Sequence, residues 1–190
     1  TTRKQQLLGV LTSDVVKAPF RRTIRTFGRV TYDETRLRQV HAKVAGYVEK
    51  LYANATGEMV GKGQPLADVY SPELLASQQE YLVALAARAR TAGSSIPSVA
   101  GSGDELVASA RRRLELYDLS EEQIRDVERS GHARRAVTLY APISGTILER
   151  RVTEGQRIEP EMNLLDLADL SRVWVLASVY DYELPFVRKG

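Results

Sequence analysis

A short sequence pattern occurs twice in this chain and constrains its fold more than any other feature. Gly46 and Val48 in the first copy correspond to Gly145 and Ile147 in the second, at an offset of 99. Four later pairs follow at an offset of 98, namely Gly57 with Gly155, Val60 with Ile158, Leu66 with Leu164, and Val69 with Leu167. Two copies are too few for a stacked solenoid. The duplication therefore predicts one compact β unit built from two similar halves, with something inserted between them.

Composition narrows the class of protein. Of the 190 residues, 43% are hydrophobic and the mean hydropathy is −0.28, which is typical of a soluble folded chain. No apolar run approaches the ~20 residues that span a bilayer. The polar first residues show no signal peptide, as expected of a mature or trimmed chain. The absence of cysteine excludes disulfides, thiolate metal sites and a cysteine nucleophile.

The charge pattern argues against nucleic acid as a partner. The net charge is +3, and residues 1–35 carry seven basic against three acidic side chains, 7 − 3 = +4. No aromatic residues alternate with these arginines as a base-stacking platform requires, so we interpret them as a solvated strand face. No nucleophile elbow, phosphate loop or dinucleotide fingerprint occurs, and we expect no enzyme activity.

Strand patterns occupy both ends of the chain. Residues 23–32 alternate polar with β-branched and aromatic residues, which predicts a strand. Residues 36–70 predict short strands separated by glycine turns. Residues 173–180 are apolar at successive positions, which indicates a strand buried on both faces. The end strands have no other obvious partner, so we expect either that the chain is a fragment or that its two ends complete each other.

The segment between the two copies has helical periodicity. Ser71 and Pro72 predict a helix start, and the helix is expected to reach about residue 92. Residues 93–103 have a loop composition. A capping box at residues 102–105 then predicts a second helix, with Val107, Ala110, Leu114 and Tyr117 on its buried seam. A second capping box at residues 120–123 opens a short helix that closes near Gly131.

The duplication and the insertion together suggest a split sandwich. Two halves of this kind form the flattened barrel of lipoyl and biotinyl domains, where a tight hairpin bearing the modified lysine joins them. Here the 65 residues 71–135 occupy that junction. Lys62 lies inside the first half instead, so a carrier role is not favoured.

Several stretches resemble the CusB-like heavy-metal efflux adaptors, a group of periplasmic membrane fusion proteins. Residues 40–52 (VHAKVAGYVEKLY) resemble the first lipoyl half, and residues 70–82 (YSPELLASQQEYL) resemble the start of the helical insertion. Residues 139–147 (LYAPISGTI) resemble the second half, and residues 168–175 (ADLSRVWV) the entry into the adaptor β-barrel. Residues 5–10 resemble the first strand of the membrane-proximal domain.

The resemblance implies an α+β multi-domain fold. It comprises a lipoyl-like barrel-sandwich hybrid split by a three-helix insertion, with part of a β-barrel and a membrane-proximal strand. The implied domains are a membrane-proximal segment at 1–20, a partial β-barrel at 21–36 and 169–190, the hybrid at 37–70 and 136–168, and the helical domain at 71–135.

The resemblance also implies a role. Such adaptors lie in the periplasm against the inner membrane, where they link a resistance-nodulation-division (RND) pump to an outer-membrane channel. They self-associate in a ring, as trimers or hexamers. The alternatives are an adaptor for a drug RND pump or ABC exporter and, from another class, a biotinyl or lipoyl carrier domain.

Candidate metal ligands are few, and we expect no resident cofactor. Met59 and Met162 occupy nearly equivalent places in the two halves and could meet as soft thioether ligands, although packing explains them better. His41 and His132 precede the two halves and could share an ion with a carboxylate, although ordinary junction histidines are favoured. A transported heavy-metal ion is the only ligand that the resemblance implies.

Three consecutive arginines, at 111–113, lie on the second predicted helix. Because Leu114 supplies the buried seam, these side chains are expected to point outward into solvent. The alternative is contact with an acidic neighbour, a second protomer or the channel.

Overall fold

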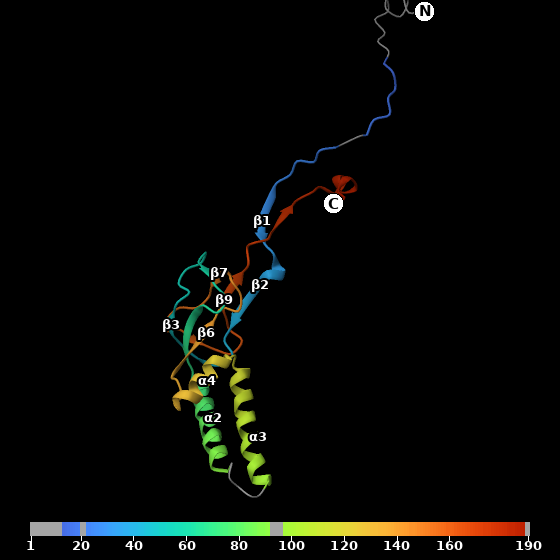
Figure 1. The fold of residues 1–190 in the computed structure, drawn as a ribbon. Helices are drawn as coiled ribbons and strands as arrows, with labels where there is room; N and C mark the ends of the chain where they lie inside the picture. Colours follow the sequence, from blue (N-terminus) through green and yellow to red (C-terminus); the bar gives the residue numbers. More distant parts are fainter. Residues whose placement is uncertain (1–12, 20–21, 92–96, 189–190) are drawn as a thin grey trace, which may run out of the picture. The chain divides into compact units, whose positions relative to one another are not determined.

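The computed structural model describes residues 13–19, 22–91 and 97–188, with side chains at all of these except 97–101 (Figure 1). The predicted strand at 5–10 and the first part of the predicted loop at 93–96 lie outside the described residues. The chain divides into two compact units: Val30–Trp174, and Thr1–Arg29 together with Val175–Gly190. Among the described helices, none combines the length and apolarity needed to cross a membrane.

The larger unit contains two four-stranded antiparallel sheets. The first has the order β2 (Leu37–His41), β9 (Asn163–Ala168), β7 (Gly145–Arg150), β4 (Met59–Val60). The second has the order β6 (Ala136–Tyr140), β5 (Pro65–Tyr70), β3 (Gly46–Leu51), β8 (Arg157–Ile158). Each sheet takes two strands from each copy of the repeat. The halves are therefore interlocked, which confirms the duplicated sandwich predicted from the sequence.

Reciprocal backbone hydrogen bonds join the two halves. The Gly57 N–H donates to the Ile147 carbonyl at 2.8 Å, and at the equivalent place the Gly155 N–H donates to the Val48 carbonyl at 2.8 Å. Both glycines adopt positive φ, at 90° and 78°. Glycine enters this region without the steric cost that other residues meet, so these turns explain why both copies keep glycine there.

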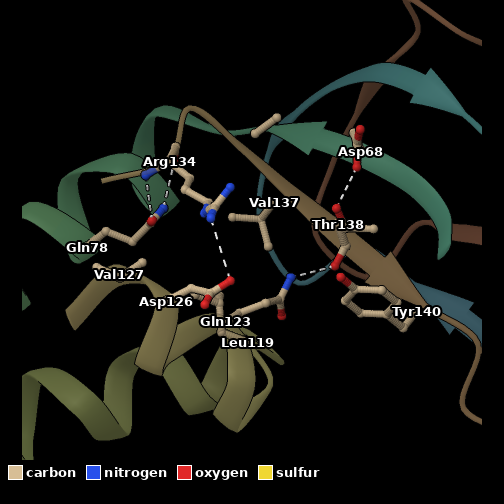
Figure 2. Close-up of a pocket in the computed structure, with 11 residues that line it drawn as sticks. Asp68, Gln78, Leu119, Gln123, Asp126, Val127, Arg134, Val137, Thr138 and Tyr140 are labelled. Carbon is tan, nitrogen blue, oxygen red and sulfur yellow. Dashed lines mark hydrogen bonds and ion pairs between the residues drawn. The ribbon is translucent and has the colours of Figure 1, made fainter. Parts of the chain in front are cut away.

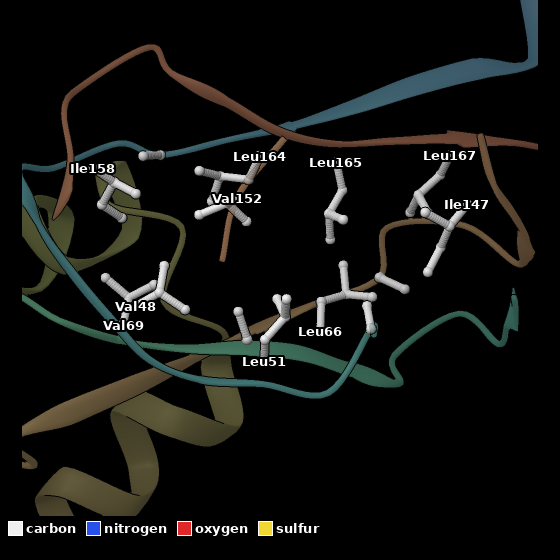
Figure 3. Packing of buried hydrophobic residues seen from close by; sticks show 14 of the residues in the cluster. Val48, Leu51, Leu66, Val69, Ile147, Val152, Ile158, Leu164, Leu165 and Leu167 are labelled. Carbon is white, nitrogen blue, oxygen red and sulfur yellow. The ribbon is translucent and has the colours of Figure 1, made fainter. Parts of the chain in front are cut away.

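The sandwich core lies between the two sheets (Figure 3). Leu66 and Ile147, one from each half, are both fully buried. The cluster comprises Ala42, Val48, Leu51, Ala53, Val60, Leu66, Ala67, Val69, Ala141, Ile147, Val152, Ile158, Leu164, Leu165 and Leu167. The core is therefore continuous across the repeat, and neither half has a core of its own.

Three helices fill the junction between β5 and β6: α2 (Pro72–Thr91), α3 (Pro97–Leu116) and α4 (Glu121–Ser130). We call them the helical arm. In Figure 1, α2 and α3 run side by side in opposite directions. The Ser71 hydroxyl accepts from the Leu74 N–H at 3.4 Å, as the predicted start of α2 requires. The capping box at Ser120 and a left-handed Gly131 at the end of α4 are also present, so these bounds are confirmed.

The predicted start of the second helix is wrong. The helix begins at Pro97 and not at the capping box of residues 102–105, and the expected loop at 97–103 is helical. Proline suits a first helical position. Gly103 has a packing role: a Cβ there would lie 2.9 Å from Thr91 Oγ1 and 3.0 Å from Arg88 Cα. The glycine thus lets α3 approach α2 closely, and it does not end a helix.

The strands β1 (Gly28–Tyr32) and β10 (Val173–Ala177) pair with each other in a two-stranded ribbon. The strand predicted over 23–32 is thus shorter than expected. All five residues of β10 are exposed, so the prediction of burial on both faces is wrong for this structure. Among the described residues, β10 has one partner strand and no second layer. Two short 3-10 turns complete the described elements, η1 (Glu34–Arg36) and η2 (Asp181–Phe186).

Candidate functional site

The helical arm joins the sandwich through a second apolar cluster. Its helical members include Leu74 and Leu114, and Val44 and Val137 of the sandwich complete it. Val137 is a β6 residue only 6% exposed, and Val44 is 4% exposed. The arm is therefore packed against the sandwich and is not merely tethered by its two connections.

Gln78 of α2 fastens the arm to Arg134, in the connection that leads into β6 (Figure 2). Its amide nitrogen donates to the Arg134 carbonyl at 3.1 Å, and its amide oxygen accepts from the Arg134 N–H at 2.9 Å. The side chain is 1% exposed. A buried amide bonded in both directions acts like one rung of a β-ladder, and losing it leaves two backbone groups without partners.

A second polar link runs from α4 into both neighbouring strands. The Gln123 amide donates to the Thr138 carbonyl at 2.8 Å, and the Thr138 hydroxyl donates to Asp68 at 2.6 Å (Figure 2). Asp68 also accepts from the Tyr52 hydroxyl at 2.8 Å, and this hydrogen bond is the main reason that the pKa of Tyr52 lies above its usual value. A cavity of about 230 Å³ between arm and sandwich is lined by Gln78, Gln123, Asp68 and Thr138, among others.

Arg111 joins all three helices. Its guanidinium pairs with Glu115 at 3.0 Å, with Glu121, and with Glu128 at 3.5 Å. The Tyr81 hydroxyl of α2 donates to Glu128. Burial, together with this hydrogen bond, raises the pKa of Tyr81. The expectation that Arg111 points into solvent is therefore wrong, because acidic residues of α4 face this side of α3.

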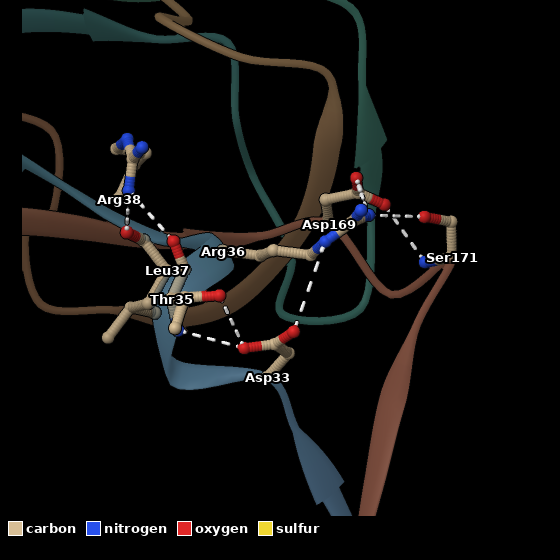
Figure 4. A network of polar contacts seen from close by, with 7 residues as sticks. All are labelled: Asp33, Thr35, Arg36, Leu37, Arg38, Asp169 and Ser171. Carbon is tan, nitrogen blue, oxygen red and sulfur yellow. Dashed lines mark hydrogen bonds and ion pairs between the residues drawn. The ribbon is translucent and has the colours of Figure 1, made fainter.

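The opposite end of the sandwich contains a separate polar network (Figure 4). Arg36 pairs with Asp169 at 2.6 Å and donates to the Ser171 hydroxyl at 2.7 Å. Asp33 accepts from the Thr35 hydroxyl at 2.6 Å, and this bond holds the pKa of Asp33 below its usual value. The network ties the start of β2 to the residues that follow β9.

The two methionines do not meet. Met59 pairs with Thr146, which lies opposite Ala168 at one end of β9, whereas Met162 precedes Asn163 at the other end. Five residue steps along a strand span about 17 Å. Met59 is 81% exposed, and Met162 packs on the sandwich core. The structure thus separates the two thioethers that the sequence placed in equivalent positions.

The two histidines serve different local roles. His41 Nδ1 lies 3.1 Å from the Glu161 carbonyl oxygen. His132 is exposed, and its backbone N–H donates to the Ser130 hydroxyl at 3.3 Å. Within the ranges that the structure describes, no three His, Cys, Asp or Glu side chains form a group suited to a metal ion. The disfavoured alternative, in which these histidines share an ion with a carboxylate, therefore has no assembled group among the described residues.

Some of the junction residues could be found from the sequence and others could not. Gln78 lies on the apolar face of the first predicted helix, and a lone amide in an apolar stripe signals a buried partner. Arg111 carried no such signal, because its carboxylate partners belong to a helix whose placement only tertiary packing determines. The polar side chains of the junction bond mainly to one another and to the backbone, an arrangement that fixes the position of the arm.

Known proteins share both the sequence and the fold. The family model described as "CusB, barrel-sandwich hybrid domain" matches residues 37–168. The cation efflux system protein CusB of Escherichia coli K12 is 29% identical over 174 residues, covering 92% of this chain and 40% of that protein. The cobalt-zinc-cadmium resistance protein CzcB of Cupriavidus metallidurans is 28% identical over 195 residues, covering 96% of this chain and 37% of that protein. The chain thus spans about two fifths of the curated relatives it matches.

Solved structures agree on the fold. ZneB from Cupriavidus metallidurans superposes with a TM-score of 0.53 at 18% identity, covering 85% of this chain and 72% of that one. A MacA–MexA chimera that contains the Pseudomonas aeruginosa MexA α-hairpin domain gives a TM-score of 0.57 at 21% identity, covering 87% and 60%. The family match covers 132 residues, 168 − 37 + 1, which is more than half of the chain. With its interlocked sheets and the helical arm between them, the chain belongs to the CusB barrel-sandwich hybrid domain family.

Proposed function

We propose that this chain is the adaptor of a tripartite heavy-metal efflux system. In this role it lies in the periplasm at the inner membrane and links an RND pump to an outer-membrane channel as one copy of a ring. The proposal includes the membrane-proximal segment at 1–20, the partial β-barrel at 21–36 and 169–190, the hybrid at 37–70 and 136–168, and the helical domain at 71–135. Its contribution is mechanical and involves no catalysis.

The observation that carries the proposal is the placement of the arm. A lipoyl-type sandwich needs only a tight hairpin between its halves, because Tyr70 and Ala136 are paired neighbours on β5 and β6. This chain inserts three packed helices there and fixes them with Gln78 and Gln123. A fixed projecting arm suits a protein that must reach a second partner, and the names of the relatives indicate that this partner belongs to a cation efflux system.

The carrier alternative has less support. Lys62 lies in the turn before β5, where its backbone N–H donates to the Ser144 hydroxyl at 2.8 Å. The hairpin at which a carrier lysine would sit is replaced by the arm. An intact mass equal to that of the unmodified chain is expected, and a biotin or lipoate increment on Lys62 would favour the carrier instead.

Metal handling by the chain itself is a separate question, which titration answers. The separated Met59 and Met162 and the unassembled histidines favour a pure connector. Calorimetric titration with Cu⁺, Ag⁺, Zn²⁺ and Ni²⁺ is then expected to show no stoichiometric binding. Binding that is lost in His41→Ala or Met59→Ala would instead give the adaptor a direct part in ion transfer.

Growth experiments test the role in the cell. Disruption of the gene that encodes this chain is expected to lower the concentration of one or more heavy metals that cells tolerate, and expression in trans to restore it. Unchanged tolerance to copper, silver, zinc, cobalt and cadmium would contradict the proposal. Sensitivity to organic drugs in their place would favour the drug-exporter alternative.

A further inference from the structure

The two halves of the sandwich carry equivalent loops of opposite charge. Residues 61–63 precede β5 in the first half, and residues 159–161 precede β9 in the second, at the offset of 98. The first loop reads Gly-Lys-Gly and the second Glu-Pro-Glu. Their backbones match: the Gly63 N–H donates to the Ala141 carbonyl and the Glu161 N–H to the Ala42 carbonyl, both at 2.8 Å. The fold therefore repeats, whereas the charge is reversed.

The lysine loop borders a basic pocket. Its cavity of about 370 Å³ has Arg36, Arg38, Lys62 and Asp169 in its lining. Arg36 is occupied by Asp169 and, at 4.0 Å, by Asp33 (Figure 4). Arg38 donates to the carbonyls of Thr35 and Leu37, and across the described part of the chain neither Arg38 nor Lys62 pairs with a carboxylate. The lining carries three cations and the Asp169 carboxylate, and Asp33 beside Arg36 adds a second carboxylate, which leaves 3 − 2 = +1 and keeps the pocket open to an anionic group.

Glu161 in the other loop is a carboxylate held in a strained position. Its φ is 67°, a left-handed conformation that its equivalent Gly63 adopts at φ 80° without steric cost. A residue other than glycine costs about 1 kcal/mol or more there. Glu159 is paired with Arg157 at 2.8 Å, but within the described ranges no cation pairs with the exposed Glu161. Glycine would relax the turn, so folding alone does not explain an acidic side chain here. The carboxylate is instead available to bind another molecule.

The two loops lie at opposite ends of the sandwich. Glu161 is next to the Asn163 end of β9, whereas Asp169, in the wall of the basic pocket, follows the Ala168 end. Six residue steps from Asn163 to Asp169 span about 20 Å. One copy therefore cannot satisfy its own basic pocket with its own Glu161. A contact between the loops of two copies is head-to-tail, and such contacts propagate into closed rings when the rotation between copies closes.

We propose that Glu161 of one copy docks in the pocket formed by Arg38 and Lys62 of the next copy, and that this pairing orders the sandwiches in a ring. The inference rests on the proposed adaptor function, because that function requires a ring. It adds the contact between neighbouring copies that forms the ring. Opposite charges across an interface mainly set which surfaces meet and in which register. Because the two equivalent loops carry opposite charges, the two ends of the pseudo-symmetric sandwich differ, and each contact between copies joins unlike ends.

Zero-length crosslinking tests the contact directly. A carbodiimide joins an amine to a carboxylate only when they touch, and a mixture of ¹⁴N- and ¹⁵N-labelled chains identifies bonds between copies. The expected product is a mixed-isotope peptide pair that joins Lys62 to Glu161 or its neighbour Glu159. Crosslinked dimers without this pair would overturn the proposal, as would the absence of any crosslinked dimer at low salt.

Variants measured by sedimentation velocity give a second test. Glu161→Gly removes the carboxylate and relieves the backbone strain, so thermal stability should hold or rise while the self-association Kd increases about tenfold. Lys62→Ala with Arg38→Ala should weaken association to a similar degree. Lys50→Ala, at an exposed lysine on β3, is the matched control and should leave the Kd unchanged. Equal Kd values for parent and Glu161→Gly would contradict the docking.

An equimolar mixture of the two weakened proteins tests the head-to-tail geometry. The Glu161→Gly chain keeps its basic pocket and the doubly substituted chain keeps Glu161, so one intact contact remains. Dimers that do not grow further are expected, and mixtures no more associated than either variant alone would contradict the geometry. Gene disruption tests the adaptor role independently: a loss of metal tolerance together with unaltered association of Glu161→Gly would overturn the docking and leave the proposed function intact.

Discussion

The sandwich and the helical arm are stabilised in different ways. The sandwich has a continuous apolar core and backbone hydrogen bonds that the repeat makes reciprocal, such as those of Gly57 and Gly155. The arm has a smaller apolar cluster, and side-chain links from Gln78, Gln123 and Arg111 add to it. Backbone ladders and apolar burial involve no titrating group, whereas exposed ion pairs are screened by salt and lost when the carboxylate is protonated. The sandwich and the neutral links that attach the arm are thus the fixed part, and the ion pairs between the helices of the arm are the part that solution conditions can adjust.

The largest expected loss of stability comes from replacing a glycine of the sandwich, and a glycine of the arm provides the comparison. A Cβ at Gly46 would lie 2.1 Å from the Tyr70 carbonyl oxygen, so Gly46→Ala must push β3 from β5. We expect a loss of about 4 kcal/mol in the free energy of unfolding. Gly103→Ala in the arm meets Thr91 Oγ1 and Arg88 Cα at 2.9 and 3.0 Å but gains helix propensity, and should cost under about 1 kcal/mol. Urea unfolding followed by circular dichroism compares the two, and equal losses would remove the distinction.

A pair of leucine truncations tests whether the two regions unfold separately. Leu66 and Leu114 are each 0% exposed, one in the sandwich core and one in the arm cluster. Each change to alanine should cost about 3 kcal/mol. Leu66→Ala is expected to lower the whole unfolding transition, whereas Leu114→Ala should loosen the amides of α2–α4 and leave the sandwich protected. Hydrogen exchange read by mass spectrometry measures this, and identical exchange patterns would mean that the regions form one cooperative unit.

Removal of the Gln78 link has a smaller expected effect. Gln78→Ala leaves the Arg134 N–H and carbonyl without partners at the arm–sandwich junction, at a cost of about 2 kcal/mol. The exposed Gln79, next in the sequence, provides the control, and Gln79→Ala should stay within about 0.5 kcal/mol of the parent. Thermal unfolding compares the two variants, and equal midpoints would contradict a role for Gln78 in attaching the arm.

The smallest expected effect is a pH dependence confined to the arm. The hydrogen bond from Arg111 lowers the pKa of Glu121 below its ordinary value of 4.5. A carboxylate with a lowered pKa in the folded state stabilises the fold above its unfolded pKa, and that stabilisation is lost as pH falls through the folded pKa. Glu121→Gln should therefore be less stable than the parent at pH 7 and should match it in acid. Denaturant midpoints at several pH values measure the difference, and a gap that persists in acid would contradict this cause.

The sequence predicts the regions that local rules determine. The spacing of Gly46 and Gly145 predicted the duplicated sandwich, since both are sites where another strand's carbonyl approaches too closely for a Cβ. The capping box at Ser120 predicted the start of α4, because its partners lie within four residues. These features depend on neighbours in the chain or on the period of the repeat, and both are visible without a structure.

The predictions that failed depended on tertiary neighbours. Gly103 resembled a turn residue, but it allows α2 and α3 to pack closely. Arg111 was assigned to solvent because Leu114 supplies the buried seam, but its partners Glu121 and Glu128 lie on another helix that packs on this side. β10 is apolar on both faces, yet it is exposed in this structure. In each case the sequence does not reveal which helix or strand packs against the residue, and that neighbour determines the outcome.

Excision of the arm tests the central claim, that the sandwich is a self-sufficient holder and the arm provides the bridge. Tyr70 and Ala136 are paired across β5 and β6, so a two-residue Asn-Gly turn can replace residues 71–135 and close the hairpin. Val44→Thr and Val137→Thr would make the uncovered face polar. We predict that this shortened chain unfolds cooperatively with the strand content of the sandwich, while cells that express it lose metal tolerance as completely as cells without the gene. Retained tolerance, or a sandwich that no longer folds, would contradict the account.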